Sequence, residues 1–321
     1  MAAAPNRSMP EVVDLSKLRG GDLDSLLADE VLTWRSTLSW DFTASANLVK
    51  RYLAIHSLNG YALKVGSHFI GYCYYVSEER KGLIGDLYVS REWASQETED
   101  LLLSAALNAL VSTSGVDRIE AQLMLLHGPF ERTVPLARYG QIYPRIFMRA
   151  ELNESSPLPS VQSENDLRWE EWNAKREDES AGVIAVAYRD HVDGNINDQY
   201  RTRAGARRFL HNVVNYPGCG SFLPKASLVA LDRTKQIAGL IMASSVAGDV
   251  GHITQVCVSP QWKRRGVGYE LVRRSMLAMA DHGCERASLT VTAANRNAIE
   301  LYQNIGFRAV RRFAAYVWEG F

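Results

Sequence analysis

The 321-residue chain contains one pattern twice, at a separation of about half its length. Residues 84–93 (IGDLYVSREW) align with residues 253–262 (ITQVCVSPQW), sharing Ile, Val, Ser and Trp at a constant offset of 169. A weaker match pairs Gly71 with Gly239 at an offset of 168. Self-similarity at a nearly fixed offset is the signature of a repeated architecture. We therefore expect two copies of one fold.

Both copies show the same order of expected elements. In the second copy, strands are expected over 226–231, 237–244, 252–258, 288–292 and 307–318, with helices over 268–282 and 297–304. In the first copy, strands are expected over 61–65, 69–76, 83–89 and 119–126, with a helix over 99–111. Strands and helices mixed in this order predict an α/β (α+β) fold, a mixed sheet flanked by helices in each copy.

A segment of linker composition separates the copies. Residues 153–166 (NESSPLPSVQSEND) collect Ser, Pro, Asn and acidic side chains between two apolar-patterned halves, a composition typical of a linker. The sequence therefore predicts a domain over 1–152, a linker over 153–166 and a second domain over 167–321.

Charge and cysteine content narrow the class of protein. Thirty-six basic and thirty-six acidic residues give a formal net charge of zero, which argues against nucleic acid as a partner. The four cysteines, Cys73, Cys219, Cys257 and Cys284, are far apart, so we expect neither a zinc site nor a disulfide scaffold. Uncharged runs stop short of the ~20 residues that a membrane span needs. We expect a cytoplasmic protein without a bound metal or a membrane partner, as a monomer or homodimer.

The segment most informative about chemistry is 256–269 (VCVSPQWKRRGVGY), in which a strand runs through a basic glycine loop into a helix. Glycines let the backbone turn its N–H groups inward, and the helix start adds the positive end of its dipole, so this arrangement suits an anion. It matches neither the phosphate loop G-x-x-x-x-G-K-[ST] nor the dinucleotide motif G-x-G-x-x-G. A solvated basic turn is the alternative interpretation.

The loop, taken with residues 295–307 (NRNAIELYQNIGF), resembles the acetyl-CoA loop and C-terminal motif of the GNAT N-acetyltransferase superfamily. The resemblance is strong over 237–321 and weaker in the first half, and the tandem arrangement resembles the mycothiol synthase group. It implies two tandem GNAT-like domains, each with a twisted mixed sheet that is splayed in the middle, and acetyl-CoA in the splay. Lys263 departs from the family's usual Gln or Arg, which keeps the charge and loses bidentate geometry.

The resemblance also implies roles for individual residues. Backbone groups of the strand would pair with the pantetheine arm, and the loop would hold the pyrophosphate. The implied cofactor-binding residues are Val256, Cys257, Val258, Lys263, Arg264, Arg265, Gly266, Val267, Gly268, Tyr269 and Asn295. Tyr302 matches the tyrosine beside the coenzyme A sulfur, where a phenol can protonate the departing thiolate.

The general base is less constrained by the sequence. Many relatives carry a Glu about fourteen residues before the first loop glycine, and the count back from Gly266 reaches His252. An imidazole with an intrinsic pKa near ~6.5 suits proton removal, directly or through water. Asp249, Glu319 and chains of water are the alternatives.

The first copy lacks the loop's chemistry. Residues 91–99 (REWASQETE) hold no glycine and three acids, and Leu136 stands where the second copy has Tyr302. We therefore expect no transfer chemistry in 1–152. The expected activity is transfer of acetyl from acetyl-CoA to a primary amine of a small polar acceptor by direct attack, with the polar run 188–200 shaping the acceptor side. The alternative is a non-catalytic acyl-CoA-binding or regulatory protein.

Overall fold

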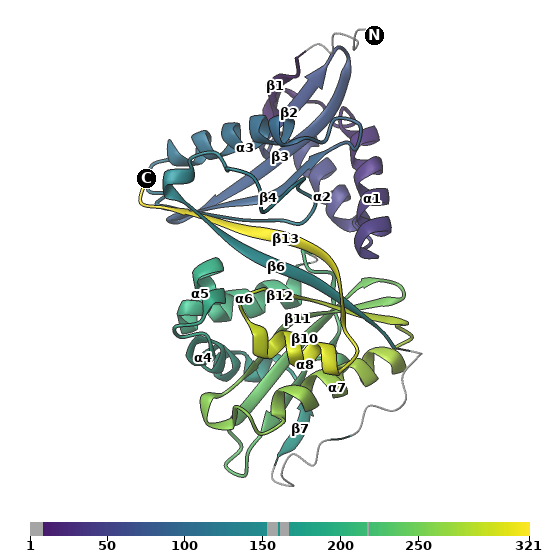
Figure 1. Ribbon diagram of the computed structural model, residues 1–321, viewed down its shortest axis with the longest axis vertical. Helices are drawn as coiled ribbons and strands as arrows, with labels where there is room; N and C mark the ends of the chain where they lie inside the picture. The colour runs from purple at the N-terminus through teal and green to yellow at the C-terminus, as the bar shows by residue number, and fades with distance from the viewer. Residues whose placement is uncertain (1–8, 153–159, 161–166, 217) are drawn as a thin grey trace. The chain divides into compact units, whose positions relative to one another are not determined.

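The computed structural model describes residues 9–152, 160, 167–216 and 218–321, so the expected linker lies, apart from Ser160, outside the described residues (Figure 1). The chain forms two compact units. Unit 1 comprises Met1–Ser36, Phe42–Pro144 and Phe313–Phe321, and unit 2 comprises Thr37–Asp41 and Arg145–Arg312. Each unit is a mixed sheet flanked by helices, which confirms the predicted fold class.

The sheet of unit 1 has the strand order β1-β2-β3-β4-β5-β13. Neighbouring strands are antiparallel except β4 and β5, which are parallel. Its elements are β1 (Glu11–Asp14), α1 (Asp24–Leu38), α2 (Thr43–Ala54), β2 (Asn59–Val65), β3 (His68–Glu78), β4 (Lys81–Val89), α3 (Gln96–Val111), β5 (Arg118–Leu123), η2 (Ala137–Tyr139) and the end of β13 (Arg308–Glu319).

The sheet of unit 2 repeats this order as β7-β9-β10-β11-β12-β6, and β8 also pairs with β10. Only β11 and β12 are parallel among its paired strands. Its elements are the end of β6 (Gly140–Glu151), β7 (Arg168–Glu171), α4 (Glu177–Ala187), α5 (Val192–Ile196), α6 (Arg203–Asn215), β8 (Ser221–Phe222), β9 (Leu228–Leu231), β10 (Ile237–Ala247), β11 (Val250–Val258), η6 (Pro260–Trp262), α7 (Val267–Asp281), β12 (Arg286–Thr292) and α8 (Arg296–Asn304).

Each unit takes its last strand from the other half of the sequence. In unit 2, β6 pairs with β12 from Glu151 opposite Arg286 to Arg145 opposite Thr292. In unit 1, β13 pairs with β5 and buries Tyr316 and Trp318. The two sequence repeats therefore exchange strands, a feature that the linker composition does not reveal.

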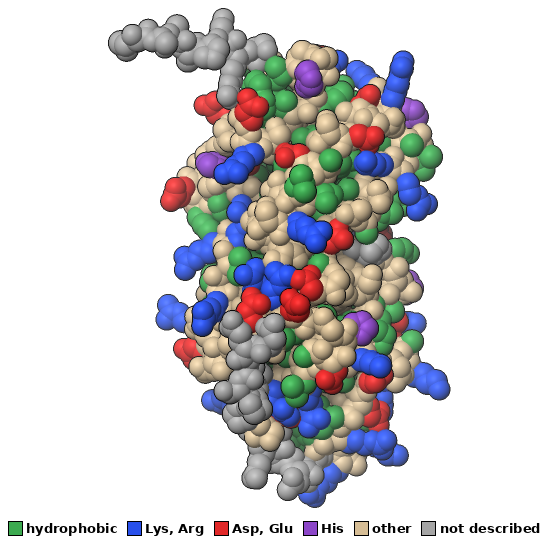
Figure 2. Space-filling model, turned by 90° about the vertical axis from the view of Figure 1, so that its right-hand side faces the viewer, with side chains coloured by type: hydrophobic (Ala, Val, Ile, Leu, Met, Phe, Trp, Pro, Cys, Tyr) green, Lys and Arg blue, Asp and Glu red, His purple; other side chains and the backbone are tan. Residues whose placement is uncertain are grey.

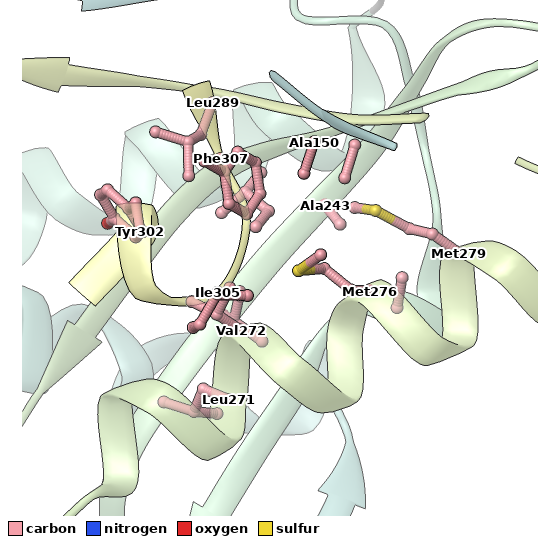
Figure 3. Close-up of a cluster of buried hydrophobic side chains, with 14 of the residues drawn as sticks. Ala150, Ala243, Leu271, Val272, Met276, Met279, Leu289, Tyr302, Ile305 and Phe307 are labelled. Atoms are coloured by element: carbon pink, nitrogen blue, oxygen red, sulfur yellow. The ribbon is translucent and has the colours of Figure 1, made fainter. Parts of the chain in front are cut away.

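Two apolar clusters cover the two faces of the unit 2 sheet. One packs α7 and α8 on the sheet and includes Leu271, Met276, Met279, Leu289 and Phe307 (Figure 3). The other packs α4 and α6 against the opposite face, which side chains such as Leu240, Met242 and Cys257 supply. The result is a three-layer arrangement of helices, sheet and helices.

The repeated glycine has a packing reason in both units. A Cβ on Gly71 would lie 2.9 Å from Val89 and 3.3 Å from Leu102, a residue of α3. A Cβ on Gly239 would lie 3.0 Å from both the Cys257 carbonyl oxygen and Leu271 of α7. In each unit the helix after the central strand thus packs directly on a glycine of the neighbouring strand.

Candidate active site

Two parallel strands separate in the middle of the unit 2 sheet. The pairing of β11 with β12 runs from Val250 opposite Arg286 to Ile253 opposite Leu289 and ends there. β11 continues to Val258, while β12 continues along β6 to Thr292. The backbone of Val256, Cys257 and Val258 therefore follows the point of divergence, as the predicted splay requires. The same divergence follows Ile84 and Ala121 in unit 1.

The basic loop leads from β11 through η6 to an open helix start. Gly266 is the N-cap of α7 with φ 77°, and no side chain caps the helix there. A positive φ suits glycine, and the first N–H groups of a helix have no partner within it. Arg264 also has a positive φ of 61°. Lys263, Arg264 and Arg265 thus precede a helix N-terminus whose N–H groups and dipole suit an anion.

The one acidic residue in the first turn of α7 does not cancel the positive charge at the helix start. Glu270 is buried and accepts hydrogen bonds from Arg273 at 2.7 and 2.8 Å and from Arg274 at 2.9 Å. Burial raises the pKa of this carboxyl, but the arginines outweigh it and the net pKa is lowered. Its negative charge is therefore compensated within α7.

A polar cluster lies where β12 ends and α8 begins. The Thr292 hydroxyl donates to Asp193, and the Asn295 amide lies 3.3 Å from His191 Nε2. Asn295 also caps α8, accepting the Ala298 N–H. We refer to His191, Asp193, Thr292 and Asn295 as the polar cluster. It brings the predicted Asn295 together with the 188–200 run, and the phenol of Tyr302 lies within electrostatic range of its Asp193.

The predicted acid Tyr302 has a buried side chain. Its side chain is 8% exposed, its ring centroid lies 5.9 Å from that of Phe307, and its oxygen is turned away from Met276 and Met279 (Figure 3). Burial raises the pKa of the phenol, and the negative charge of Asp193 raises it further. The phenol therefore keeps its proton at neutral pH, which an acid requires.

Gln255 lies on β11 directly before the 256–258 segment, and Tyr188 contacts it. The Tyr188 hydroxyl donates to Gln255 Oε1 at 2.6 Å and lies 3.4 Å from the Val256 carbonyl oxygen. Burial raises the pKa of the neighbouring Cys257 thiol to about 12, although Lys263 opposes the shift. This thiol stays protonated, consistent with a small strand residue rather than a nucleophile.

The contacts of His252 are with residues outside the polar cluster. Its Nδ1 is 2.9 Å from the Ser288 hydroxyl, and its ring lies 5.0 Å from Trp40 and 6.1 Å from Phe147. Burial, with a contribution from Arg145, lowers the pKa of His252 to about 3. Its role as the base stays a prediction, and these surroundings make it a weak proton acceptor at neutral pH.

The two alternative carboxylates are occupied elsewhere. Asp249 precedes β11, at the end opposite the splay, and forms an ion pair with Arg286. Glu319 belongs to unit 1, where it pairs with Arg118. The sequence analysis did not single out Thr292 or Gln255. It included His191 and Asp193 only as members of the polar run 188–200.

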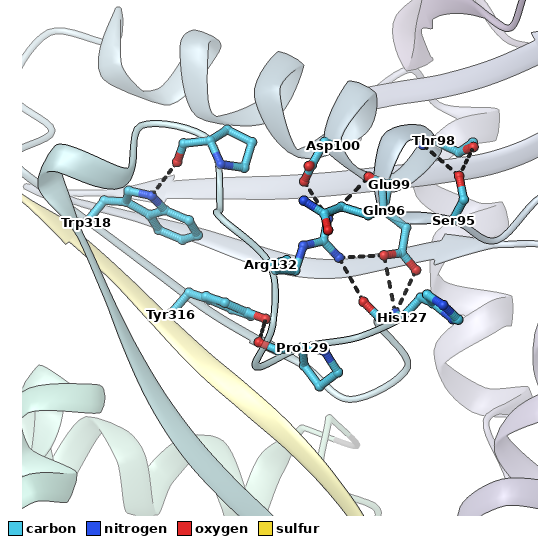
Figure 4. A network of polar contacts seen from close by, with 11 residues as sticks. Ser95, Gln96, Thr98, Glu99, Asp100, His127, Pro129, Arg132, Tyr316 and Trp318 are labelled. Atoms are coloured by element: carbon cyan, nitrogen blue, oxygen red, sulfur yellow. Dashed lines mark hydrogen bonds and ion pairs between the residues drawn. The ribbon is translucent and has the colours of Figure 1, made fainter.

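The corresponding helix start in unit 1 is closed by side chains. Ser95 caps α3 by accepting the Thr98 N–H at 3.2 Å (Figure 4). Glu99 accepts the His127 N–H at 2.9 Å and pairs with Arg132 at 2.5 Å, while Arg132 also pairs with Asp100. The positions that an anion would use are therefore filled by the chain's own groups.

A surface hollow of unit 2 lies over two of its helices. A hollow of about 650 Å³ over α4 and α6 is lined by Arg203 and Arg207, which already pair with Asp178 and Glu177. In the described ranges no group of three or more His, Cys, Asp and Glu could hold a metal ion, and no helix is long and apolar enough to cross a membrane. Basic and acidic side chains are intermixed on the face drawn in Figure 2.

Comparison with known sequences identifies the segment that carries the loop. Residues 202–307 match the acetyltransferase (GNAT) family. N-alpha-acetyltransferase 30 of Xenopus laevis is 31% identical over 70 residues, which cover 22% of this chain and 26% of the frog protein. A mycothiol acetyltransferase of Thermobispora bispora is 25% identical over 185 residues, covering 56% of this chain and 60% of that protein.

Comparison with solved structures extends to almost the whole chain. A GCN5-related N-acetyltransferase from Sphaerobacter thermophilus matches with a TM-score of 0.67 and 15% identity, covering 98% of this chain and 96% of that one. A tandem GNAT protein from the clavulanic acid biosynthesis pathway matches with a TM-score of 0.60 and 14% identity, covering 97% and 98%. At such identities the likeness concerns the fold, and it includes the tandem arrangement.

Proposed function

We propose that the chain transfers acetyl from acetyl-CoA to a primary amine of a small polar acceptor, by direct attack of the amine, because residues 202–307 match the acetyltransferase (GNAT) family. The observation that carries the proposal is the divergence of β11 from β12 beside the uncapped, basic start of α7. Acetyl-CoA supplies the activated acetyl thioester as a cosubstrate.

The binding roles follow from the loop and the strand. Main-chain groups of Val256, Cys257 and Val258 would pair with the pantetheine arm, because β12 no longer pairs with β11 there. The pyrophosphate would be held by the N–H groups of 264–269 and by the charges of Lys263, Arg264 and Arg265. Asn295 would keep the start of α8 in place beside the cofactor.

The proton transfers are assigned to two side chains. Tyr302 would donate its proton to the departing thiolate, since its buried phenol is protonated at neutral pH. For the base, His191 is favoured over His252, because His191 contacts Asn295 and its Nδ1 lies 3.7 Å from Asp193. Asp193 would orient the imidazole for this role.

Tyr302→Phe tests the acid. The variant loses only a hydroxyl, so acetyl-CoA affinity should stay within about twofold, while turnover falls by roughly 10²-fold to 10⁴-fold, the contribution of a positioned acid. Calorimetry with acetyl-CoA and release of free thiol over a panel of small amines and short peptides measure both. Tyr216→Phe, at an exposed tyrosine after α6, is the matched control. Undiminished turnover in Tyr302→Phe would show that Tyr302 is not the general acid.

The same panel tests the acceptor. Faster turnover of small polar amines than of peptides with free N-termini supports the proposed acceptor class. The opposite ranking would show that peptides with free N-termini are the preferred acceptors. Acetyl-CoA binding without thiol release for any acceptor would contradict the proposed transfer.

A further inference from the structure

The face of the unit 2 sheet that packs on α4 and α6 carries hydrogen-bonding groups without partners. Ser244 Oγ, Gln255 Nε2 and Arg145 Nε are buried, and none has a hydrogen-bond partner among the described residues. Ser244 is fully buried and Gln255 is 5% exposed. Buried polar atoms are normally paired, so three incomplete groups in one unit call for an explanation.

Strand register places these groups on one face. Ser244 stands opposite His252, and Met242, two residues earlier on β10, stands opposite Gln255. On β12, Ser288 stands opposite His252 of β11. Thr292, four residues further along β12, stands opposite Arg145 of β6. Because directly opposed residues and residues two apart share a face, all of these side chains lie on the same side of the sheet.

The missing partner is a hydrogen-bond acceptor. The Nε atom of arginine and the Nε2 atom of glutamine only donate. Arg145 also carries a full positive charge, which contributes to the lowered pKa of His252. No carboxylate pairs with Arg145 in the described part of the chain, whereas Arg149, on the same strand, pairs with Glu151. A partly buried cation without a counter-ion is costly unless a ligand supplies one.

An opposite charge lies next to the same strand end. Thr292 stands opposite Arg145 and donates its hydroxyl to Asp193. A cationic and an anionic side chain thus flank Thr292 of the polar cluster, whose Asp193 is within electrostatic range of Tyr302. This pattern is complementary to a molecule that has an amino group and an anionic group.

We propose that the acceptor amine carries an anionic oxygen group, a carboxylate or a phosphate, and that Arg145 binds this group with Gln255 as a second donor. The inference rests on the proposed transfer reaction and names its substrate class. Arginine suits the role because its planar fork matches both anions with two parallel hydrogen bonds.

Matched pairs of amines test the charge preference. Glycine, β-alanine and γ-aminobutyrate are compared with their amides, and O-phosphoethanolamine with ethanolamine, using calorimetry in the presence of coenzyme A and thiol release with acetyl-CoA. The wild-type chain should bind at least one anionic member roughly tenfold to a hundredfold more tightly than its neutral counterpart, the effect of a charge-assisted hydrogen bond. The acid pairs and the phosphate pair distinguish the two anions. If no anionic member exceeds its neutral counterpart, the inference is wrong.

Substitutions then locate the preference. Arg145→Gln should remove the discrimination and leave acetyl-CoA affinity unchanged, whereas Arg149→Gln should preserve the discrimination. The melting temperature of Arg145→Gln should not fall, because the variant loses an unpaired charge, while a purely structural arginine would lower it. Retained discrimination in Arg145→Gln would overturn the assignment. Turnover of neutral and anionic amines at equal rates would refute this inference and leave the proposed transfer intact, whereas absence of acetyl-CoA binding would refute the transfer itself.

Discussion

His252 and His191 carry the same ring in two different surroundings. His252 is 7% exposed between Trp40 and Phe147, and its pKa is lowered to about 3. The His191 side chain is 29% exposed and lies beside Asp193. The lowered pKa makes His252 a weak proton acceptor at neutral pH, whereas His191 is open to solvent and contacts Asp193 and Asn295.

The two histidines should therefore respond differently to substitution. His191→Gln should lower turnover at neutral pH, because the side chain that accepts the proton of the acceptor amine is then missing. His252→Gln should leave the shape of the pH–rate profile unchanged, because its ring does not titrate in that range. Profiles of kcat for both variants check this. If His252→Gln loses the acidic limb of the profile while His191→Gln keeps it, His252 is the base.

The lowered pKa of His252 also predicts a dependence of stability on pH. In the unfolded chain a histidine titrates near ~6.5, so protons bind the unfolded state more strongly than the folded one. The stability that the neutral ring contributes is fully present above ~6.5 and is lost progressively as pH falls toward about 3. Urea unfolding of His252→Gln should show a weaker decline of stability between these limits than the wild type.

The count back from Gly266 leads to His252, which lies on β11. What it does not include is the irregularity between Met242 and Ala243, which pair with Gln255 and Ile253. One extra residue on β11, Thr254, changes which side chains face α4 beyond that point. Strand alternation alone therefore could not show that Gln255 shares a face with His252, and Arg145 arrives on this face from the other half of the sequence.

At the scale of elements, the strands and helices around the loop were predictable because each has a strong local pattern. The expected strand 237–244 and helix 268–282 correspond to β10 and α7. The short α5 was not predicted, since five residues carry no helical period and its position depends on contacts such as that of Asp193 with Thr292. Local sequence patterns therefore predict the loop and its neighbouring elements, whereas the polar cluster forms only through the packing of segments that are distant in the sequence.

The contrast between the starts of α7 and α3 predicts the effect of changing the loop. Gly266→Val places a branched side chain at φ 77°, a conformation that costs non-glycine residues about 1–2 kcal/mol, and it crowds the helix start. We expect loss of acetyl-CoA binding with the fold retained. Calorimetry and circular dichroism measure the two properties. Ser95→Gly, at the start of α3, is the control and should leave acetyl-CoA binding unchanged; unaltered affinity in Gly266→Val would disprove the role of the loop.

At the scale of the whole molecule, strand exchange couples the two repeats through the chain itself. A fragment of residues 167–321 lacks β6, which pairs with β12 at seven positions from Arg286 to Thr292. A fragment of residues 1–152 lacks the end of β13, including the fully buried Trp318. Each fragment would thus leave an unpaired strand edge and an uncovered part of its core.

We expect neither fragment to fold alone and the two together to restore the protein. Unpaired strand edges and exposed aromatic side chains favour aggregation, so each fragment by itself should lack a cooperative thermal transition. Co-production of 1–159 with 160–321, cut within the region between the repeats, supplies every strand and should recover both cooperative unfolding and acetyl-CoA binding. Melting curves and calorimetry on the three samples check this. If 167–321 alone melts at the temperature of the full chain and binds acetyl-CoA with the same affinity, β6 is not needed to complete unit 2. Unit 2 would then be independent of the first repeat in stability, because the strand that it borrows would add nothing to the sheet it completes.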